Sequence, residues 1–293
     1  MGANMKNIDI AVDLRNLGIR TGDTVLIRVA LQSVGRIPRS QILTDILEAV
    51  GSEGTIACLA FTDSAYRWRA DKLPPFTVAS KSNAGALPNI MLGHPDAHRS
   101  LHPQCSIVAI GKHAEFLTSD HGPKSPAYAP MRKVIDLQGK MLVIGCVKSC
   151  PGFTTAHLAE FDLKLYRRFI MTKTLTVTPY INDQGERVLY KRSDPGLCSN
   201  SYWKFYAHYV NDGLLRAGMV GDAYSVVAPA KECYAVEHAI LARDPQFNIC
   251  DEPLCATCNA LRWDRIHHAP IFAARKIARF IRQRLLQSKP DGL

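Results

Sequence analysis

Short apolar segments alternate with longer amphipathic segments over the first half of the chain. The segment TVLIRVAL at 24–31 is apolar at almost every position, which is typical of a strand inside a sheet that is covered on both faces. In the next amphipathic segment, SQILTDILEAVG, Ile42, Ile46 and Val50 recur at helical spacing and a glycine follows the last of them. The pattern therefore predicts a strand, a short loop and a helix in succession.

The same alternation continues to about residue 170. Further strands are predicted at GTIACLAF, SIVAIG and KMLVIGC, and helices at ALPNIML, KHAEFLTS and TTAHLAEFDLKLYRRF. After these, TKTLTVTPYI and RVLYKR flank NDQGE, which indicates a hairpin with a glycine-containing turn. The whole pattern predicts an α/β fold with a central, mostly parallel sheet flanked by helices, and with a hairpin in the C-terminal half.

The pattern changes near residue 249, and this change predicts two units. The first is an α/β domain at 1–248, and the second is a cysteine-containing basic extension at 249–293. In the extension, Ala274, Ile277 and Ile281 share one face of a predicted helix whose neighbouring positions carry arginines. Two interpretations of this basic helical tail stay open. It docks on the body of the protein, or it lies on an anionic membrane surface.

Composition narrows the class of protein. Hydrophobic residues make up 47% of the chain and charged residues 21%, which excludes a mostly disordered protein. The net charge of +10 favours anionic partners, but no basic stripe is interleaved with aromatic residues, so we expect no nucleic-acid partner. We expect neither a signal peptide nor a membrane-spanning segment, and therefore a cytoplasmic location. The sequence does not define the oligomeric state.

The nine cysteines are scattered and do not resemble the disulfide framework of a small secreted domain. Cys250, Cys255 and Cys258 form the pattern C-x4-C-x2-C, with His267 and His268 downstream. This spacing is compatible with a zinc knuckle or with part of an iron–sulfur site. No cysteine follows the third one, so a fourth ligand is not evident and we assign no metal-binding residues. A metal-stabilised module that binds membranes or anions through its tail is the alternative function.

The segment CPGFTTAHLAEFDL at 150–163 contains the strongest candidate for catalysis. It places His157 and Glu160 in the first turns of a predicted helix that begins at Thr154 or Thr155. The helix N-terminus disfavours a charged imidazole and a carboxylate favours it, and these opposed influences suit a general base at neutral pH. On spacing alone, a structural histidine that pairs with a helical glutamate is the better interpretation.

The order of motifs along the chain strengthens the catalytic interpretation. The chain contains, in succession, LGIRTGDTVLIRVALQSVG, ILEAVGSEGT, HRSLHPQCSIVAIGKHAEFLT, HGPKSP, LQGKMLVIGC and TTAHLAE. This succession resembles the aminoglycoside 3-N-acetyltransferase family over roughly residues 15–245. The resemblance implies transfer of an acetyl group from acetyl-coenzyme A, as co-substrate, to a small-molecule amine acceptor, an amino sugar.

The resemblance also implies roles for individual residues. The acetyl group is expected to be transferred directly, with His157 as general base. Glu160 stands in the matching acidic position. The Thr155 hydroxyl is expected to stabilise the oxyanion. Other carboxylates that stay open as partners of the histidine are Asp63, Asp71 and Asp162. The residues expected to contact coenzyme A are Leu31, Ser33, Val34, Gly35, Ser100, His102, Lys124 and Ser125.

The chain departs from the family pattern at Arg28, where the family usually has a histidine or another small polar residue. Arg28 would add positive charge near the pyrophosphate or the acceptor, or it is a solvated residue at the edge of the sheet. Because the whole chain is basic, we expect an anionic amino sugar, such as a nucleotide-linked or lipid-linked surface-polysaccharide intermediate. A competing mechanism would pass the acetyl group through Cys146 or Cys150 beside His157.

Overall fold

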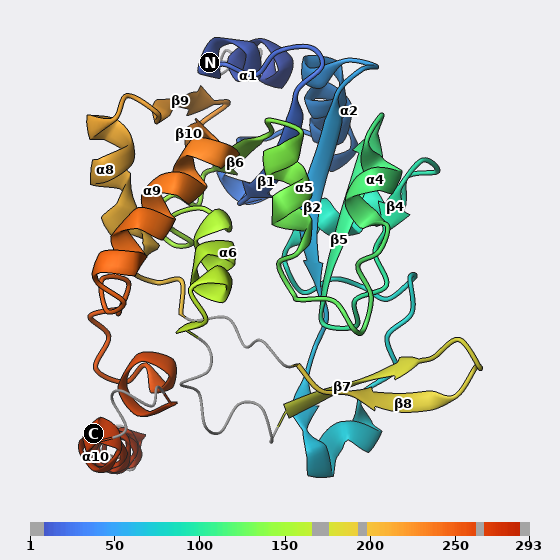
Figure 1. Cartoon of the computed structure of the whole chain (residues 1–293). Helices are drawn as coiled ribbons and strands as arrows, with labels where there is room; N and C mark the ends of the chain where they lie inside the picture. Colours follow the sequence, from blue (N-terminus) through green and yellow to red (C-terminus); the bar gives the residue numbers. More distant parts are fainter. Residues whose placement is uncertain (1–8, 166–175, 193–197, 262–266, 288–293) are drawn as a thin grey trace, which may run out of the picture.

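The computed structural model describes residues 9–165, 176–192, 198–261 and 267–287. The centre of the molecule is a seven-stranded sheet with the strand order β4-β5-β2-β1-β6-β10-β9 (Figure 1). Its strands are β1 (Thr24–Val29), β2 (Thr55–Phe61), β4 (His98–Arg99), β5 (Cys105–Gly111), β6 (Lys140–Ile144), β9 (Arg216–Val220) and β10 (Ala223–Pro229). The described helices that pack around it are α1 (Ile10–Leu17), α2 (Arg39–Val50), α3 (Ala86–Leu92), α4 (Ala114–Thr118), α5 (Pro130–Asp136), α6 (Thr155–Asp162), α8 (Tyr206–Asn211) and α9 (Ala230–Arg243).

Parallel pairing is confined to the three central strands. β1 pairs in parallel with both β2 and β6. The outer strands pair antiparallel, β5 with β2 and β4 on one side, and β10 with β6 and β9 on the other. Parallel neighbours need a crossover connection, and α2 provides the one between β1 and β2. The predicted α/β fold with a central sheet flanked by helices is confirmed.

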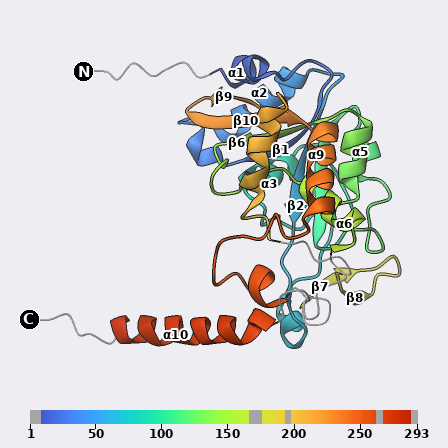
Figure 2. The ribbon, with the colours of Figure 1, turned by 60° about the vertical axis from the view of Figure 1, so that its left-hand side comes forward.

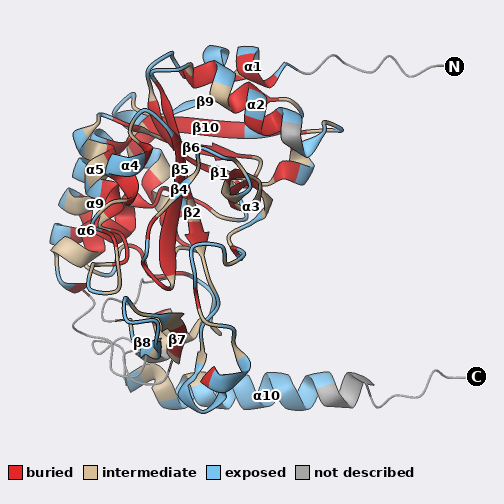
Figure 3. Cartoon of the chain, turned by 90° about the vertical axis from the view of Figure 1, so that its right-hand side faces the viewer, coloured by how far each residue is buried: buried red, intermediate tan, exposed pale blue. Residues whose placement is uncertain are grey.

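The sheet lies between two hydrophobic cores, one on each face. In β1, Leu26 belongs to the core formed with α4, α5, α6, α8 and α9, whereas Val25 and Ile27 belong to the core formed with α1, α2 and α3. This division follows from the extended backbone, in which successive side chains point to opposite faces. Figure 3 shows buried residues on the sheet and on the helices of both layers. The almost continuous apolar pattern of β1 is explained by this double covering.

Helix α6 is shorter than the sequence pattern predicts. It ends at Asp162, and Lys164 adopts a φ of 57°, in the left-handed region that an α-helix does not use. The rest of the predicted helix, from residue 166 onward, lies outside the described residues. The part of the predicted helix that carries His157 and Glu160 is confirmed.

The predicted hairpin is confirmed as β7 (Thr176–Ile181) and β8 (Arg187–Tyr190), which pair antiparallel around Gly185 at a φ of 76°. β3 (Ala65–Tyr66), which leads into the short helix η2 (Arg67–Lys72), adds a third strand beside β7. This small sheet lies beside one end of the central sheet (Figure 1).

The C-terminal helix α10 (Ala269–Gln287) does not dock on the body of the protein, so the first interpretation of the tail is wrong. Figure 2 shows the helix extending away from the sheet and its covering helices. Its apolar residues Ile277, Phe280 and Ile281 are 60%, 56% and 52% exposed. Among the described residues, no helix is long and apolar enough to cross a bilayer.

The predicted division at residue 249 stays a prediction, although the first residues of the extension are attached to the body. The ammonium group of Lys204 donates to the carbonyl oxygen of Ile249 at 2.7 Å, and the Ser201 hydroxyl donates to the carbonyl oxygen of Asn248. The segment around 249 therefore packs against the segment around 202.

Candidate active site

Helix α6 begins after a glycine-containing turn that packs against the short helix η4 (Tyr202–Phe205). Gly152 in this turn has a φ of 72°, which favours glycine. A Cβ atom at Gly152 would lie 2.2 Å from the Cβ of Tyr202, so a larger residue does not fit there. The N–H of Gly152 donates to the hydroxyl of Tyr206 at 2.9 Å. The sequence CPGFTT therefore brings the start of α6 against the segment that carries Tyr202.

His157 and Glu160 lie one turn apart on α6, and both are buried. Nδ1 of His157 lies 2.9 Å from Oε2 of Glu160 and 2.7 Å from the hydroxyl oxygen of Tyr202. The other carboxylate oxygen, Oε1 of Glu160, accepts a hydrogen bond from Nδ2 of Asn248. Glu160 is thus the carboxylate that contacts His157, and both of its oxygens have partners, as a buried carboxylate requires.

The other carboxylates considered from the sequence lie elsewhere. Asp162 forms an ion pair with Arg132 on α5. Asp63 accepts a hydrogen bond from an asparagine side chain at 2.7 Å, and Asp71 is exposed in η2. None of these three is positioned as Glu160 is, directly beside the imidazole.

The contacts at Nδ1 favour one tautomer of His157. A proton on Nδ1 faces two oxygen atoms, whereas a lone pair on Nδ1 would face the Glu160 carboxylate across 2.9 Å. With the proton on Nδ1, the lone pair that accepts a further proton is on Nε2. The carboxylate then stabilises the imidazolium that forms when Nε2 takes up a proton.

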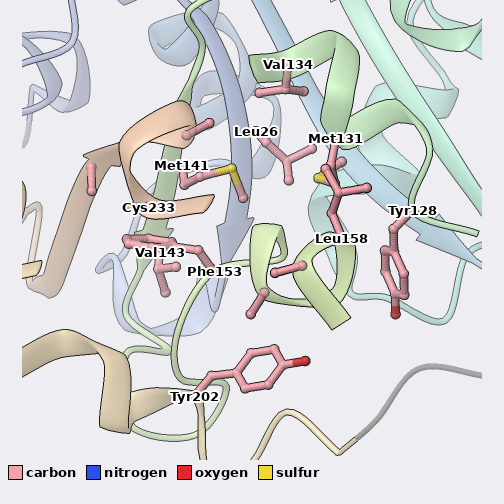
Figure 4. Packing of buried hydrophobic residues seen from close by; sticks show 14 of the residues in the cluster. Leu26, Tyr128, Met131, Val134, Met141, Val143, Phe153, Leu158, Tyr202 and Cys233 are labelled. Carbon is pink, nitrogen blue, oxygen red and sulfur yellow. The ribbon is translucent and has the colours of Figure 1, made fainter. Parts of the chain in front are cut away.

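His157 lines a cavity of about 270 Å³ with residues of β1, β2, α3 and the turn before α6. The ring of Tyr128 stacks on the imidazole, with the ring centroids 4.4 Å apart and the planes 14° apart. Figure 4 shows Tyr128 and Tyr202 on two sides of α6. The described residues that line this cavity are Ile27, Arg28, Val29, Cys58, Leu59, Phe61, Asn83, Ala84, Leu87, Pro88, Tyr128, Cys150, Thr154, His157 and Ser199.

Arg28 brings a positive charge to this cavity. It is half-buried and lines the same cavity as His157, and its guanidinium donates to the carbonyl oxygen of Gly152. β1 is a central strand, and Arg28 pairs with Val143 of β6. The interpretation of Arg28 as a solvated residue at the sheet edge is therefore wrong, because the strand has a neighbour on each side.

The Thr155 hydroxyl is not directed into the cavity. It is buried and donates to Oε1 of Glu237 on α9 at 2.9 Å, and the Tyr209 hydroxyl donates to the same oxygen. Burial raises the pKa of Glu237 well above its ordinary range, so this carboxyl group is neutral. Thr155 therefore connects α6 to α9, and it is the neighbouring Thr154 that lines the cavity of His157.

The first group of predicted coenzyme contacts follows β1, around the short helix η1 (Leu31–Ser33). Leu31 and Val34 are buried in the core beside α1 and α2. The Ser33 hydroxyl donates to the carbonyl oxygen of Ala30 at 2.7 Å, and Gly35 has a φ of 115°. The half-buried Ser33 and Gly35 keep some accessible surface, whereas the two apolar side chains offer little to a coenzyme.

Ser100 and His102 are also buried, and both are engaged inside the protein. The Ser100 hydroxyl accepts the N–H of Ile107 at 2.9 Å. Nδ1 of His102 accepts the N–H of Cys105 at 2.9 Å, and Nε2 lies 3.0 Å from the Tyr190 hydroxyl. Burial lowers the pKa of His102 to about 3, so it is neutral and fixes the turn between β4 and β5.

Lys124 and Ser125 line a different and larger cavity, of about 830 Å³, next to the β7–β8 hairpin. This cavity shares no described lining residue with the cavity of His157. Lys124 is exposed, and the Ser125 hydroxyl donates to the carbonyl oxygen of Asp120 at 2.8 Å. The described structure therefore does not gather all the predicted coenzyme contacts into one cleft.

The sequence did not predict Tyr202 and Asn248, which contact His157 and Glu160. They lie 45 residues from His157 and 88 residues from Glu160 along the chain. No spacing rule connects positions so far apart. A local signal is the asparagine within the otherwise apolar stretch FNIC.

The fold also supplies a fourth cysteine to the pattern at the start of the extension. Sγ atoms of Cys198, Cys250, Cys255 and Cys258 all lie within 4.8 Å of one another. Such a group could hold a metal ion, which the sequence pattern of three cysteines left open.

A histidine–carboxylate pair at the wall of a cavity is an arrangement that enzymes with a general base use. The model of the family described as aminoglycoside 3-N-acetyltransferase matches residues 26–242. A curated relative, aminoglycoside N(3)-acetyltransferase III of Serratia marcescens, is 28% identical over 260 residues, which cover 81% of this chain and 90% of the relative. The chain belongs to the aminoglycoside 3-N-acetyltransferase family.

Solved structures support this assignment. The binary complex of AAC-IIIb with CoASH is 25% identical, with a TM-score of 0.68, and the match covers 80% of this chain and 95% of that chain. AAC-VIa bound to sisomicin is 26% identical, with a TM-score of 0.66, and the match covers 80% of this chain and 96% of that chain. The predicted family and the acetyltransferase class are therefore confirmed.

Proposed function

We propose that this protein transfers the acetyl group of acetyl-coenzyme A directly to the amino group of an amino sugar, with His157 as general base. One observation carries the proposal. Nδ1 of His157 contacts the buried Glu160 carboxylate, and His157 also lines a cavity. Family membership supports both the donor and the type of acceptor. The nine cysteines, all free, suit the predicted cytoplasmic location, where coenzyme A is available.

The residues divide the work of proton transfer. Most amino sugars are protonated at neutral pH, so a base must take a proton before the nitrogen can attack the thioester that the coenzyme supplies. Nε2 of His157 accepts that proton. Glu160 holds the proton on Nδ1, and Asn248 fixes the carboxylate through its other oxygen. The stacked ring of Tyr128 limits the rotation of the imidazole.

We propose an anionic amino sugar as acceptor, such as a nucleotide-linked or lipid-linked intermediate. Arg28 carries a positive charge in the cavity, and no described lining residue of that cavity is an aspartate or glutamate. A polycationic drug needs nearby carboxylates to offset its charge, and the described wall offers none. The net charge of +10 also attracts an anionic acceptor at long range and repels a cationic one.

The acceptor is tested by measuring thiol release from acetyl-coenzyme A with a UDP-linked amino sugar and with kanamycin. We expect a higher kcat/KM for the UDP-linked sugar, and we expect Arg28→Gln to lower that value much more than the value for kanamycin. A clear preference for kanamycin would refute the anionic acceptor and leave acetyl transfer intact. Absence of amine-dependent thiol release with either acceptor would refute the transfer itself.

We also propose that α10 makes the predicted contact with anionic membranes. Exposed Ile277 and Ile281 lie one turn apart on this helix, and the same helix carries Arg275, Lys276, Arg279 and Arg282. An apolar face beside basic side chains is the pattern of a helix that lies in the interface of an anionic bilayer. Such contact would bring the enzyme to a lipid-linked acceptor, and it does not require that catalysis has been lost.

A further inference from the structure

Four cysteines from two segments that are distant in the sequence meet at the start of the C-terminal extension. Cys198 lies before η4, while Cys250, Cys255 and Cys258 lie in and before the single π-helical turn η5 (Thr257–Leu261). Their Sγ atoms all lie within 4.8 Å of one another, and all four are free thiols. Cys250 and Cys258 are buried, and the other two are half-buried.

We propose that these four cysteines bind one Zn²⁺ ion as a closed, tetrahedral structural site. With Zn–S bonds of about 2.3 Å, sulfur atoms at the corners of a tetrahedron lie about 3.8 Å apart. The Sγ atoms need to move by only about 1 Å or less from their separations of up to 4.8 Å to reach this geometry. A four-iron cluster spreads its cysteine ligands over the corners of a larger cube, so it fits this spacing less well.

The surroundings suit a thiolate-bound ion. The backbone N–H of Asn200 donates to Sγ of Cys198 at 3.4 Å, the kind of outer hydrogen bond that orients a metal ligand. Four thiolates around one Zn²⁺ leave a net charge of −2, and the ammonium of Lys204 is bound to the carbonyl oxygen of Ile249, the residue before Cys250. His267, the exposed histidine in the original pattern, is not a member of this ligand set.

The ion would stabilise a part of the chain whose described residues bury little apolar surface. Beside the cysteines themselves, Ile249 is the buried apolar residue of the local cluster. A structural zinc ion contributes folding energy directly where apolar burial is small. It would clamp segment 198–204 to segment 248–258. These two segments carry Tyr202 and Asn248, the partners of His157 and Glu160.

Metal analysis of the full chain, purified under reducing conditions, tests the site independently of any catalytic assay. We expect about one zinc ion per chain and an X-ray absorption spectrum with four Zn–S bonds of about 2.3 Å. Cys255→Ser should lower the zinc content well below one equivalent. Cys150→Ser, a matched change at a half-buried cysteine outside the cluster, should retain it.

Three results would overturn the assignment: iron in place of zinc, a nitrogen ligand in the absorption spectrum, or a wild-type chain without metal. Hydrogen exchange after chelation tests the clamp itself. We expect faster amide exchange in segments 198–204 and 248–258, with strands β1, β2 and β6 unchanged. Unchanged exchange in the two segments, or equal loss of protection in the strands, would contradict a local clamp.

Discussion

His157 is in contact with a residue of its own helix and with residues from two other parts of the chain. Its exposed fraction is 8%. Tyr128 stacks on the face of the ring, and Glu160 and Tyr202 both contact Nδ1. The spacing within α6 predicted the Glu160 partner, because positions three apart on a helix are neighbours. It could not predict Tyr202, because that contact depends on how the turn at Gly152 packs against η4.

Substitution of His157 or Glu160 should affect transfer more than folding. We expect His157→Ala to lower kcat by about 100-fold or more, the usual contribution of a general base. Glu160→Gln removes the negative charge that stabilises the imidazolium and should lower kcat by at least about tenfold. Steady-state kinetics of thiol release measure both effects.

Asp162→Asn is the matched control, since Asp162 lies on the same helix but binds Arg132 and the Tyr234 hydroxyl. It should leave kcat nearly unchanged. A loss equal to that of Glu160→Gln would contradict the assigned carboxylate. Loss of all transfer in Cys150→Ala, with His157 intact, would instead favour passage of the acetyl group through the cysteine that lines the same cavity.

At the scale of elements, the contact of α6 with α9 depends on a buried neutral carboxyl group. Glu237 is fully buried and accepts hydrogen bonds from the hydroxyl groups of Thr155 and Tyr209. Sequence analysis assigned Thr155 to the oxyanion because its position at the start of α6 is compatible with that role. The packing of a second helix decides which way such a side chain points, and a single helical segment contains no information about that neighbour.

Stability should therefore depend on the ionisation of Glu237. Its pKa is raised by burial, so the folded state keeps a proton that the unfolded state releases above about 4.5. The free energy of unfolding of the wild type should fall as pH rises above that value, by at most about 1.4 kcal/mol per pH unit from this group. In Glu237→Gln this dependence should disappear, because the amide keeps an acceptor oxygen without ionising.

Urea unfolding of both proteins between pH 4.5 and pH 8.5 measures the difference. The free energies of unfolding of the wild type and of Glu237→Gln should differ least near pH 4.5. As pH rises, the variant should become more stable relative to the wild type. Glu232→Gln, at an exposed position of the same helix, should follow the wild type. Parallel pH curves for wild type and Glu237→Gln would show that the carboxyl group is not neutral in the folded protein.

At the scale of the whole molecule, the sequence predicted the covering of the central sheet by helices better than it predicted the position of the C-terminal helix α10. An apolar run such as that of β1 indicates directly that both faces of the sheet are covered, because a strand that is buried on both faces must be apolar on both. Antiparallel edges need no long crossover, so the strand pattern alone did not reveal where parallel pairing ends. The amphipathic pattern of α10 was also correct, but a pattern of this kind does not say which surface covers the apolar face.

Membrane contact should depend on the apolar face of α10. We expect the full chain to sediment with vesicles that contain phosphatidylglycerol and to be released by high salt, since both charge and apolar burial contribute. Ile277→Ser combined with Ile281→Ser should abolish sedimentation. Val210→Ser, which changes a side chain of similar exposure on α8, should not. A wild-type chain that does not sediment with these vesicles would refute the proposed contact.

Asn248 lies six residues beyond the last position that the family model matches, residue 242. A truncation after residue 242 would keep every strand of the central sheet and the imidazole itself. It would nevertheless remove the amide that holds one oxygen of Glu160. A chain shortened to the part that matches the family would thus keep the sheet but leave Glu160 without its amide partner. The ribosome must also synthesise the chain as far as Asn248 before this contact can form.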